Sequence, residues 1–451
     1  MHMLYLVKGD HFAMNTRYSR RQVMGMGLGS LALLGLAGCA PSSSTPSGVN
    51  QNAAAALKMF FWGSATRNTL TNGAIKLFHQ SYPSVTVSSQ YSGNNVYYAK
   101  LDSQIAQGQA PDLIQMDMRY VSGYVRQGVL LELSQLIYDQ TINLTDFDAN
   151  QIISSKVNNG IYGVSLGSNY QCMFYDQTRL LKVGFAPPTP TMSWETFSNY
   201  LVELSDALDD GSYGSSDNSG NYDNFEIWIR QRGKELYTVE GSLGFELADV
   251  AEWFNYWDVL RKAGGCPPAH IQAALDLTGT PVDSSVVKGV VVFSHIFSNQ
   301  YVAYQAATTH PLVLSVYPAA MTPGMYIKVS QMLSIAADTK YQTDAAEFVS
   351  FLVTNPDAVK TLGFERGVPA SAAALAYLKP SFTPAEQTIV SFMDYVSTSG
   401  VARSKVVLDP PGAAKVTTSL TQVANQVAAG SLSVSAGAQA FYTQAQKDTQ
   451  V

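Results

Sequence analysis

The chain has little of what metal and nucleophile chemistry requires. Of its 451 residues, only 3 are cysteine and 6 are histidine, and neither a Cys-x-x-Cys nor a His-x-x-x-His spacing occurs. A metal site with a sequence signature is therefore absent, as is a glycine-rich phosphate-binding loop. Carboxylates are plentiful but form no recognisable pair, so the sequence neither supports nor rules out a glycosidase.

Charged residues are also scarce, at 14% of the chain against 46% hydrophobic residues. A chain of this length and composition can bury a large core and has room for two or three domains. The net charge is −6, and it becomes −9 without the residues before Cys39, which include four basic residues and one acidic residue. An acidic surface argues against nucleic acid as a partner.

Residues 1–38 have the order of a signal peptide. Arg20 and Arg21 precede a short apolar region that ends at small residues before Cys39. The apolar stretch is shorter than the ~20 residues that a membrane-spanning helix needs. The paired arginines resemble a twin-arginine signal, but Val23 replaces the usual Phe, so the ordinary secretory route stays open.

The sequence Leu36-Ala37-Gly38-Cys39 resembles a bacterial lipobox, whose cysteine is lipidated after cleavage. Residues 39–56 are rich in Ser, Pro, Ala and Asn without periodicity, which predicts a flexible tether.

Translation could start at Met1 or at Met14. Two further cysteines, Cys172 and Cys266, could form a disulfide in an exported protein, but their distance in sequence favours two buried thiols.

Apolar patterns predict two successive β-α-β units, and hence a parallel sheet with right-handed crossovers. The expected strands are 57–63, 84–90 and 111–117, and the expected helices are 69–80 and 96–107. Ligands bind outside the carboxyl ends of such strands, which points to Trp62, Ser64 and Asp117. Trp62 could equally be a ligand platform or a packing residue. Asp117 could meet ligand hydroxyls or cap the next helix.

Two extended runs, 161–170 and 172–176, follow. Ser165 formally matches a nucleophile elbow, but a second strand rather than a helix follows it, so a catalytic role is discounted. Residues 213–228 read as two strand-like runs around an Asp- and Asn-rich turn, which predicts a hairpin. Gly220 does not fall at the EF-hand position, so this turn is not expected to bind calcium.

The segment 317–371 combines a strand, a helix and a turn. We expect the strand over 326–337 and the helix over 344–354, with Asp344 as its cap and a stop at Asn355 before a proline. Elsewhere a helix is predicted over 247–262 and several helices over the tail, 383–451.

The helix sequence AAEFVSFLVTNPDA and the turn ERGVPAS resemble the solute-binding proteins of carbohydrate ABC transporters, extracellular family 1. The similarity covers nearly all of the chain from Leu57. It implies an α/β fold of the type II periplasmic-binding-protein kind, with two lobes, each a central β-sheet flanked by helices, and a ligand cleft at the hinge. The implied N-terminal lobe is 57–166 with 318–369, and the C-terminal lobe is 167–317 with 370–451.

The resemblance also implies ligand contacts from both lobes. Ser168 and Asn169, at the first crossing between lobes, would face the cleft unless they form a plain turn. Arg366 would contact ligand or form a structural salt bridge at the hinge. The remaining implied contacts are Trp228, Arg232, Asn299, Tyr326 and Lys328.

The implied function is capture of a sugar or oligosaccharide outside the membrane and its delivery to an ABC permease. Such a protein is no enzyme and needs no cofactor or metal. It would be an exported monomer, lipid-anchored through Cys39 to the outer face of the bacterial cytoplasmic membrane. The alternatives are a lipid-anchored carbohydrate-active enzyme, a surface adhesin without transport, and a binder of another polar solute such as a polyol or glycerol phosphate.

Overall fold

The computed structural model describes residues 54–153, 155–275, 280–405 and 407–450. The predicted signal peptide, Cys39 and the tether up to residue 53 lie outside these ranges. Ala55 and Ala56, at the end of the predicted tether, already belong to the first strand. Within the described ranges, no helix combines the length and the apolar character needed to cross a membrane.

Five strands form the first sheet. They are β1 (Ala55–Trp62), β2 (Val85–Ser92), β3 (Leu113–Met116), β6 (Val164–Asn169) and β11 (Lys328–Ile335). Their order is β2-β1-β3-β11-β6. β1 pairs in parallel with β2 and β3, which confirms the two predicted β-α-β units. β11 lies antiparallel between β3 and β6.

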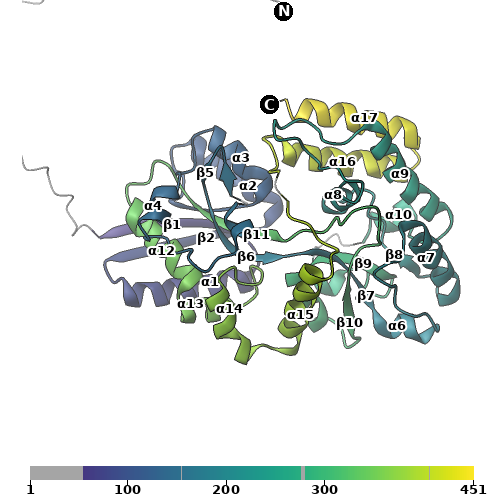
Figure 1. The fold of residues 1–451 in the computed structure, drawn as a ribbon, viewed down its shortest axis with the longest axis horizontal. Helices are drawn as coiled ribbons and strands as arrows, with labels where there is room; N and C mark the ends of the chain where they lie inside the picture. The colour runs from purple at the N-terminus through teal and green to yellow at the C-terminus, as the bar shows by residue number, and fades with distance from the viewer. Residues whose placement is uncertain (1–53, 154, 276–279, 406, 451) are drawn as a thin grey trace, which may run out of the picture. The chain divides into compact units, whose positions relative to one another are not determined.

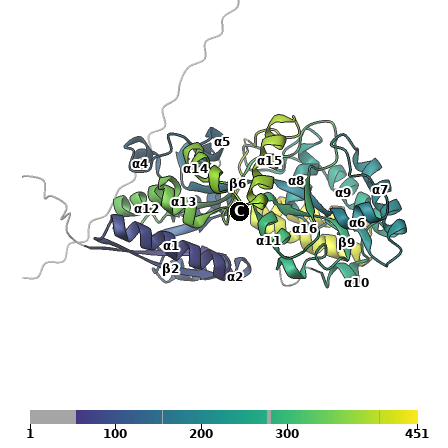
Figure 2. The same ribbon diagram turned by 90° about the horizontal axis from the view of Figure 1, so that it is seen from below.

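Helices cover both faces of this sheet, and a small hairpin of β4 (Lys156–Val157) and β5 (Gly160–Ile161) adjoins it. Figure 2 shows three of these helices, α1, α12 and α13, close together on one side. The helices are α1 (Ala65–Ser81), α2 (Asn94–Ala106), α3 (Met118–Arg126), α4 (Ser134–Tyr138), α5 (Ala149–Ile153), α12 (Gln342–Thr354) and α13 (Pro356–Leu362).

The first sheet has two cores because successive side chains of β1 point to opposite faces. Phe61 enters the core that holds Phe78 of α1 and Phe348 of α12, whose rings meet edge to face with centroids 5.0 Å apart. Phe60 and Trp62 enter the other core, formed with α2 and α3. A strand buried on both faces reads as a continuous apolar run, which explains the sequence pattern.

Four strands form the second sheet: β7 (Gln171–Asp176), β8 (Tyr213–Ser215), β9 (Val291–Phe297) and β10 (Leu312–Ser315). Their order is β10-β7-β9-β8. β7 pairs antiparallel with β10 and β9, whereas β8 runs parallel to β9. The carboxyl ends of β8 and β9 therefore lie at the same edge of the sheet.

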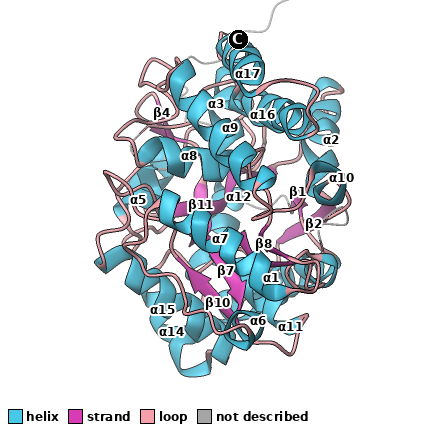
Figure 3. Ribbon diagram, turned by 90° about the vertical axis from the view of Figure 1, so that its right-hand side faces the viewer, coloured by secondary structure: helices cyan, strands magenta, loops and turns pink. Residues whose placement is uncertain are grey.

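The second sheet is flanked by helices, shown in cyan around the magenta strands in Figure 3. The predicted helical tail is confirmed. α15, α16 and α17 bury their apolar faces in the core around the second sheet, and α16 and α17 are the yellow helices of Figure 1. The helices are α6 (Gln177–Lys182), α7 (Trp194–Leu208), α8 (Tyr222–Arg230), α9 (Leu247–Lys262), α10 (Ala269–Gln272), α11 (Tyr301–Ala306), α15 (Pro384–Thr398), α16 (Ala413–Ala428) and α17 (Val434–Asp448), with single 3₁₀ turns at Pro281–Asp283, Ser298–Gln300 and Lys379–Ser381. A further helix, α14 (Ala372–Leu378), contacts α12 and α13.

The hairpin predicted over 213–228 is wrong. Its first run is β8, but its second run is helix α8, which Asn221 caps by accepting a hydrogen bond from the Asn224 backbone N–H at 2.9 Å. Almost every residue of α8 is buried. A helix buried all round lacks the polar stripe that reveals a helical period, so the sequence pattern misleads.

Asp344 does not cap α12. The helix begins at Gln342, and Tyr341 occupies the cap position without a side-chain hydrogen bond. Asp344 instead lies in the first turn, where a carboxylate interacts favourably with the helix dipole. The predicted stop at Asn355 is confirmed, and Asn355 also caps α13.

Two predictions about side-chain chemistry are confirmed. Ser165 lies on β6, its hydroxyl donates to Gln151 Oε1 at 2.8 Å, and strand β7 follows rather than a helix. Cys172 and Cys266 are free and buried thiols. Burial raises the pKa of the Cys172 thiol, which keeps it protonated and unreactive.

The turn 365–371 lies in backbone contact with β6. Ser168 N–H donates to the Val368 carbonyl at 2.8 Å, and Val368 N–H donates to the Ser168 carbonyl at 2.9 Å. A Cβ atom on Gly167 would lie 2.6 Å from the carbonyl oxygen of Arg366. The approach is therefore too close for any residue but glycine at 167.

We expect Gly167→Ala to destabilise the fold by about 1–3 kcal/mol, because one of two hydrogen-bonded backbones must shift. Gly123→Ala is the matched control. A Cβ at Gly123, within α3, would meet nothing within 4 Å, so alanine there should be neutral or stabilise by about 0.5–1 kcal/mol. Urea unfolding of both variants measures the difference, and equal stabilities would contradict the close approach.

Candidate functional site

The two sheets are joined by short segments. β6 of the first sheet ends at Asn169 and β7 of the second begins at Gln171, so a single residue, Tyr170, separates them. The return passes from β10, which ends at Ser315, to β11, which begins at Lys328. Side chains at these strand ends therefore lie where the first sheet meets elements of the second.

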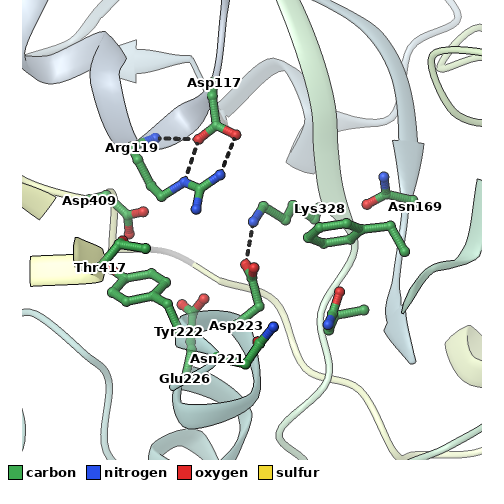
Figure 4. Close-up of polar contacts among 12 residues, drawn as sticks. Asp117, Arg119, Asn169, Asn221, Tyr222, Asp223, Glu226, Lys328, Asp409 and Thr417 are labelled. Atoms are coloured by element: carbon green, nitrogen blue, oxygen red, sulfur yellow. Dashed lines mark hydrogen bonds and ion pairs between the residues drawn. The ribbon is translucent and has the colours of Figure 1, made fainter. Parts of the chain in front are cut away.

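Two ion pairs occupy this junction (Figure 4). Asp117 follows β3 and caps α3; its carboxylate accepts hydrogen bonds from the Arg119 backbone N–H and from Nε and Nη2 of the same arginine, all at 2.9 Å. Lys328, the first residue of β11, donates to Asp223 of α8 at 2.5 Å. The second pair joins the first sheet directly to a helix of the second.

Both carboxylates are held ionised. Burial favours the neutral form of Asp117, but the charge and hydrogen bonds of Arg119 and the charge of Lys328 outweigh it and hold the pKa of Asp117 well below its usual range. Burial likewise opposes ionisation of Asp223, and Lys328 and Arg119 together lower the pKa of that carboxyl. The four charges therefore compensate one another.

A cavity of about 1130 Å³ lies next to this junction. The loop 216–221 forms one wall; it leaves the carboxyl end of β8 and leads into α8. The end of β9 and residues of α10, α11 and α16 complete the cavity. Cavities at the carboxyl ends of parallel strands are the usual ligand sites of open α/β sheets. The polar lining residues are Gln171, Ser216, Asp217, Asn218, Ser219, Asn221, Asp223, His270, Gln272, Ser284, Ser285, Ser294, His295, Gln300, Tyr304, Thr421 and Asn425.

Hydrogen bonds orient several of these groups. The hydroxyls of Ser216 and Ser294 lie 2.9 Å apart, and Asn221 Nδ2 lies 2.9 Å from His295 Nε2. The Asn221 side-chain oxygen already accepts from Asn224, so its amide donates and His295 Nε2 accepts. The His295 proton is then on Nδ1, which is buried and has no partner within the described part of the chain.

His295 carries no charge near neutral pH. Burial lowers its pKa to about 4, although the Asp223 carboxylate acts in the opposite direction. The imidazole therefore serves as a neutral hydrogen-bonding group on the cavity wall.

The structure brings four of the predicted site residues together at the junction. Asp117 and Lys328 form the ion pairs above, and Asn169 Nδ2 donates to Asn299 Oδ1 at 2.9 Å. Asn169 Oδ1 is buried without a partner in the described ranges. The Lys328 ammonium also lies 4.8 Å from the centroid of the Phe297 ring, which lines the cavity. Asp117 does cap its helix, the second of the two roles considered for it.

The other predicted residues make local contacts in one sheet or the other. Trp62 is 6% exposed and packs against Tyr97 and Tyr98, and Ser64 caps α1. Ser168 is 2% exposed and lies in the backbone pairing described above.

Three predicted residues near the second sheet and Arg366 are bound to protein groups. The Arg232 guanidinium lies 3.5 Å from the Trp228 ring centroid, and Trp228 is 4% exposed. The Tyr326 hydroxyl donates to Glu226 Oε2 at 2.6 Å. Arg366, which is 3% exposed, donates to Thr71 Oγ1 and Gln115 Oε1, and the salt bridge that was one of its two predicted roles is not found among the described residues. Among described residues, the cavity lining includes none of the residues predicted from sequence.

Sequence reasoning missed the cavity walls, although it noticed the loop 217–221. The apolar run of α8 is typical of a strand, and this predicts a hairpin turn at the loop. A run of small polar residues after a strand was the available signal, since such residues gather at ligand-binding strand ends.

Two helix-flanked mixed sheets, joined by short strand connections beside a polar cavity, define an α/β periplasmic-binding-protein fold. The family model for bacterial extracellular solute-binding proteins matches residues 73–386. The chain therefore belongs to the bacterial extracellular solute-binding protein family.

Solved structures resemble the chain over most of its length. An extracellular solute-binding protein of family 1 from Alicyclobacillus acidocaldarius is 29% identical to this chain, with a TM-score of 0.67. The match covers 88% of this chain and 98% of that one. A periplasmic oligogalacturonide binding protein from Yersinia enterocolitica, in complex with saturated digalacturonic acid, is 20% identical, with a TM-score of 0.75 and coverage of 88% and 99%. An ABC substrate-binding protein from Listeria monocytogenes, in complex with cycloalternan, is 18% identical, with a TM-score of 0.72 and coverage of 88% and 98%.

The lowered pKa of His295 predicts that the free energy of unfolding falls in mild acid. Its folded-state pKa of about 4 lies below the value of about 6.5 expected in the unfolded chain. The unfolded chain therefore takes up the proton first, and stability falls as the pH drops from about 6.5 toward 4, by at most about 3 kcal/mol. The cavity admits some solvent to His295, which screens the effect and makes this an upper limit.

We therefore expect His295→Gln to lose less stability than the original protein between about pH 7 and about pH 4.5, because glutamine takes up no proton in this range. Urea unfolding at both pH values measures the difference. A stability difference between the two proteins that does not change with pH would contradict the prediction.

Proposed function

We propose that this protein is the solute-binding component of an ABC importer and that its solute is a sugar or oligosaccharide. Family membership supports solute binding outside the cytoplasm. Two relatives of the same fold are in complex with digalacturonic acid and with cycloalternan, which supports a carbohydrate. The observation that carries the proposal is the cavity of about 1130 Å³, whose wall is rich in hydroxyl and amide groups.

The chemistry of this wall suits a saccharide. Sugar hydroxyls both donate and accept hydrogen bonds, and the Ser, Asn and Gln side chains of the lining offer both roles. Phe297 and Tyr304 add aromatic surface for the apolar faces of sugar rings. A volume of about 1130 Å³ is at the upper end of ordinary ligand pockets, of roughly 300–1,000 Å³, and favours an oligosaccharide over a single ring.

The two lobes, 57–166 with 318–369 and 167–317 with 370–451, would close on the solute about their connecting segments. Asp117, Asn169, Asn299 and Lys328 would then contact it from the junction. Ligand binding would shift the population toward the closed form, which the permease recognises.

Export and anchoring complete the proposal. The basic residues, apolar stretch and small-residue cleavage site before Cys39 support export, and Cys39 would carry the lipid that holds the protein at the outer face of the membrane. Replacement of Cys39 by serine should release the protein from membranes into the medium, as measured by fractionation.

A carbohydrate-active enzyme is the second candidate. Among the described residues, the carboxyl groups on the cavity wall are those of Asp217 and Asp223, and one oxygen of each is paired with Arg261 or Lys328. A glycosidase needs one carboxyl group that can donate a proton and one that can attack or activate water. Lys328 and Arg119 lower the pKa of Asp223 against the effect of burial, so this carboxyl group is a poor proton donor, which favours capture over cleavage.

The test is thermal unfolding of the protein against a panel of mono- and oligosaccharides, followed by product analysis of each hit. A ligand at ~100 times its Kd should add about 2.7 kcal/mol of stability. Intact sugar after binding would establish capture, and cleaved sugar would establish the enzyme. No shift with any carbohydrate would contradict the assignment.

Asn425→Ala should weaken binding of the hit saccharide by about 5- to 20-fold, because one hydrogen bond from the cavity wall is lost. Gln422→Ala is the matched control, since Gln422 is an exposed amide on the same helix, outside the lining. Isothermal titration calorimetry compares the two variants. Equal losses of affinity would place the saccharide elsewhere.

A further inference from the structure

We infer that the cavity selects uncharged saccharides and discriminates against uronic acids and sugar phosphates. The inference rests on the proposed function and deepens it by naming the class of solute. It is carried by the ion pairs that compensate the charged side chains of the described part of the cavity wall.

The lining contains no lysine or arginine among the described residues, and its acidic side chains are Asp217 and Asp223. Asp217 forms an ion pair with Arg261, and these two side chains are 3% and 6% exposed. Asp223 forms an ion pair with Lys328, and these are 13% and 8% exposed. Each cation is compensated by its carboxylate and, unlike that carboxylate, does not belong to the cavity lining.

Arg119, a further cation at the junction, is also already paired. Arg119 holds Asp117 through Nε and Nη2, both at 2.9 Å. His295 faces the cavity as a neutral ring, because burial disfavours its charged form. An anion could therefore gain one of these cations as its partner only by breaking an existing buried pair and leaving a carboxylate unpaired, which is strongly unfavourable.

An anionic solute would also meet an unfavourable field. A carboxylate or phosphate moved out of water needs a cation or several N–H donors to replace its hydration. The described wall offers hydroxyl and amide groups but no lysine or arginine, and the carboxyl groups of Asp217 and Asp223 add acceptor oxygens that repel an anion. Neutral hydroxyls gain from these same acceptors, since a carboxylate accepts hydrogen bonds from sugar O–H groups.

The oligogalacturonide binding protein of Yersinia enterocolitica shares the fold but not the sequence, at 20% identity. The fold is therefore compatible with an acidic ligand, and the residues of each cavity decide the charge of the solute. The inference concerns the wall of this chain alone.

The first experiment measures affinities by calorimetry for matched pairs, each a neutral oligosaccharide and the uronic acid oligomer of the same length and linkage. Glucosyl, galactosyl and mannosyl pairs are included, at low salt and about pH 8, above the ordinary pKa of histidine. We expect at least one neutral member to bind at least 10-fold more tightly than its acidic partner. A uronate that binds as tightly as its neutral partner, or more tightly, overturns the inference but leaves the proposed function intact. Absence of binding by every saccharide overturns the proposed function and the inference with it.

The second experiment alters the compensation. Asp223→Asn leaves Lys328 without its carboxylate, so the affinity ratio of neutral to acidic sugar should fall at least 5-fold. The double variant Asp223→Asn/Lys328→Met removes both charges and should restore a preference for the neutral sugar. Asp210→Asn is the charge-matched control: it also removes one carboxylate from an ion pair, here with Arg179, but Asp210 lies outside the cavity lining, so the ratio should stay unchanged.

An unchanged ratio in folded Asp223→Asn would overturn the role of the Asp223–Lys328 pair in selection. Circular dichroism and urea unfolding establish that each variant is folded. Should Asp223→Asn not fold, the matched pairs measured on the original protein still decide the inference.

Discussion

The arrangement of the site depends on the ion pair between Lys328 and Asp223. It joins the first residue of β11, in the first sheet, to helix α8, beside the second sheet, at 2.5 Å. The pair is nearly buried, and a buried pair is far more costly to break than an exposed one. It also fixes the charge of the neighbouring cavity, because Asp223 belongs to the cavity wall. One interaction thus couples the junction of the two sheets to the chemistry of the proposed solute site.

The remaining features of the cavity follow from topology and packing. β8 and β9 run parallel, so the loop 216–221 and the residues after β9 emerge at the same edge of the sheet. α8 begins directly after that loop, with Asn221 as its cap, and this places Asp223 at the cavity. The rigid buried helix gives the short polar side chains of the wall fixed positions, as a site that recognises hydroxyl groups requires.

Much of the fold was predictable from sequence, because β1, α1, β2, α2 and β3 follow periodic apolar patterns that local reasoning can read. The family was predictable from the segment 344–371. α8 was not predictable, because its burial on all sides removes the polar stripe of a surface helix. The cavity wall that α8 and the loop before it form was therefore not predictable either. Trp228 and Arg232 show the opposite error: their residue types suit ligand contact, but their ring and guanidinium contact each other at 3.5 Å. Side-chain direction, which decides such cases, is set by tertiary packing that no single segment encodes.

The most direct test of the account is hydrogen–deuterium exchange of the protein with and without a bound saccharide. The account predicts slower exchange in the loop 216–221 and in residues 294–300, which carry the cavity wall and the junction, because a bound solute suppresses local opening there. The hairpin of β4 and β5, which contributes nothing to the cavity lining, should exchange at the same rate in both states. Protection elsewhere, with the loop 216–221 unchanged, would contradict the claim that this cavity is the solute site.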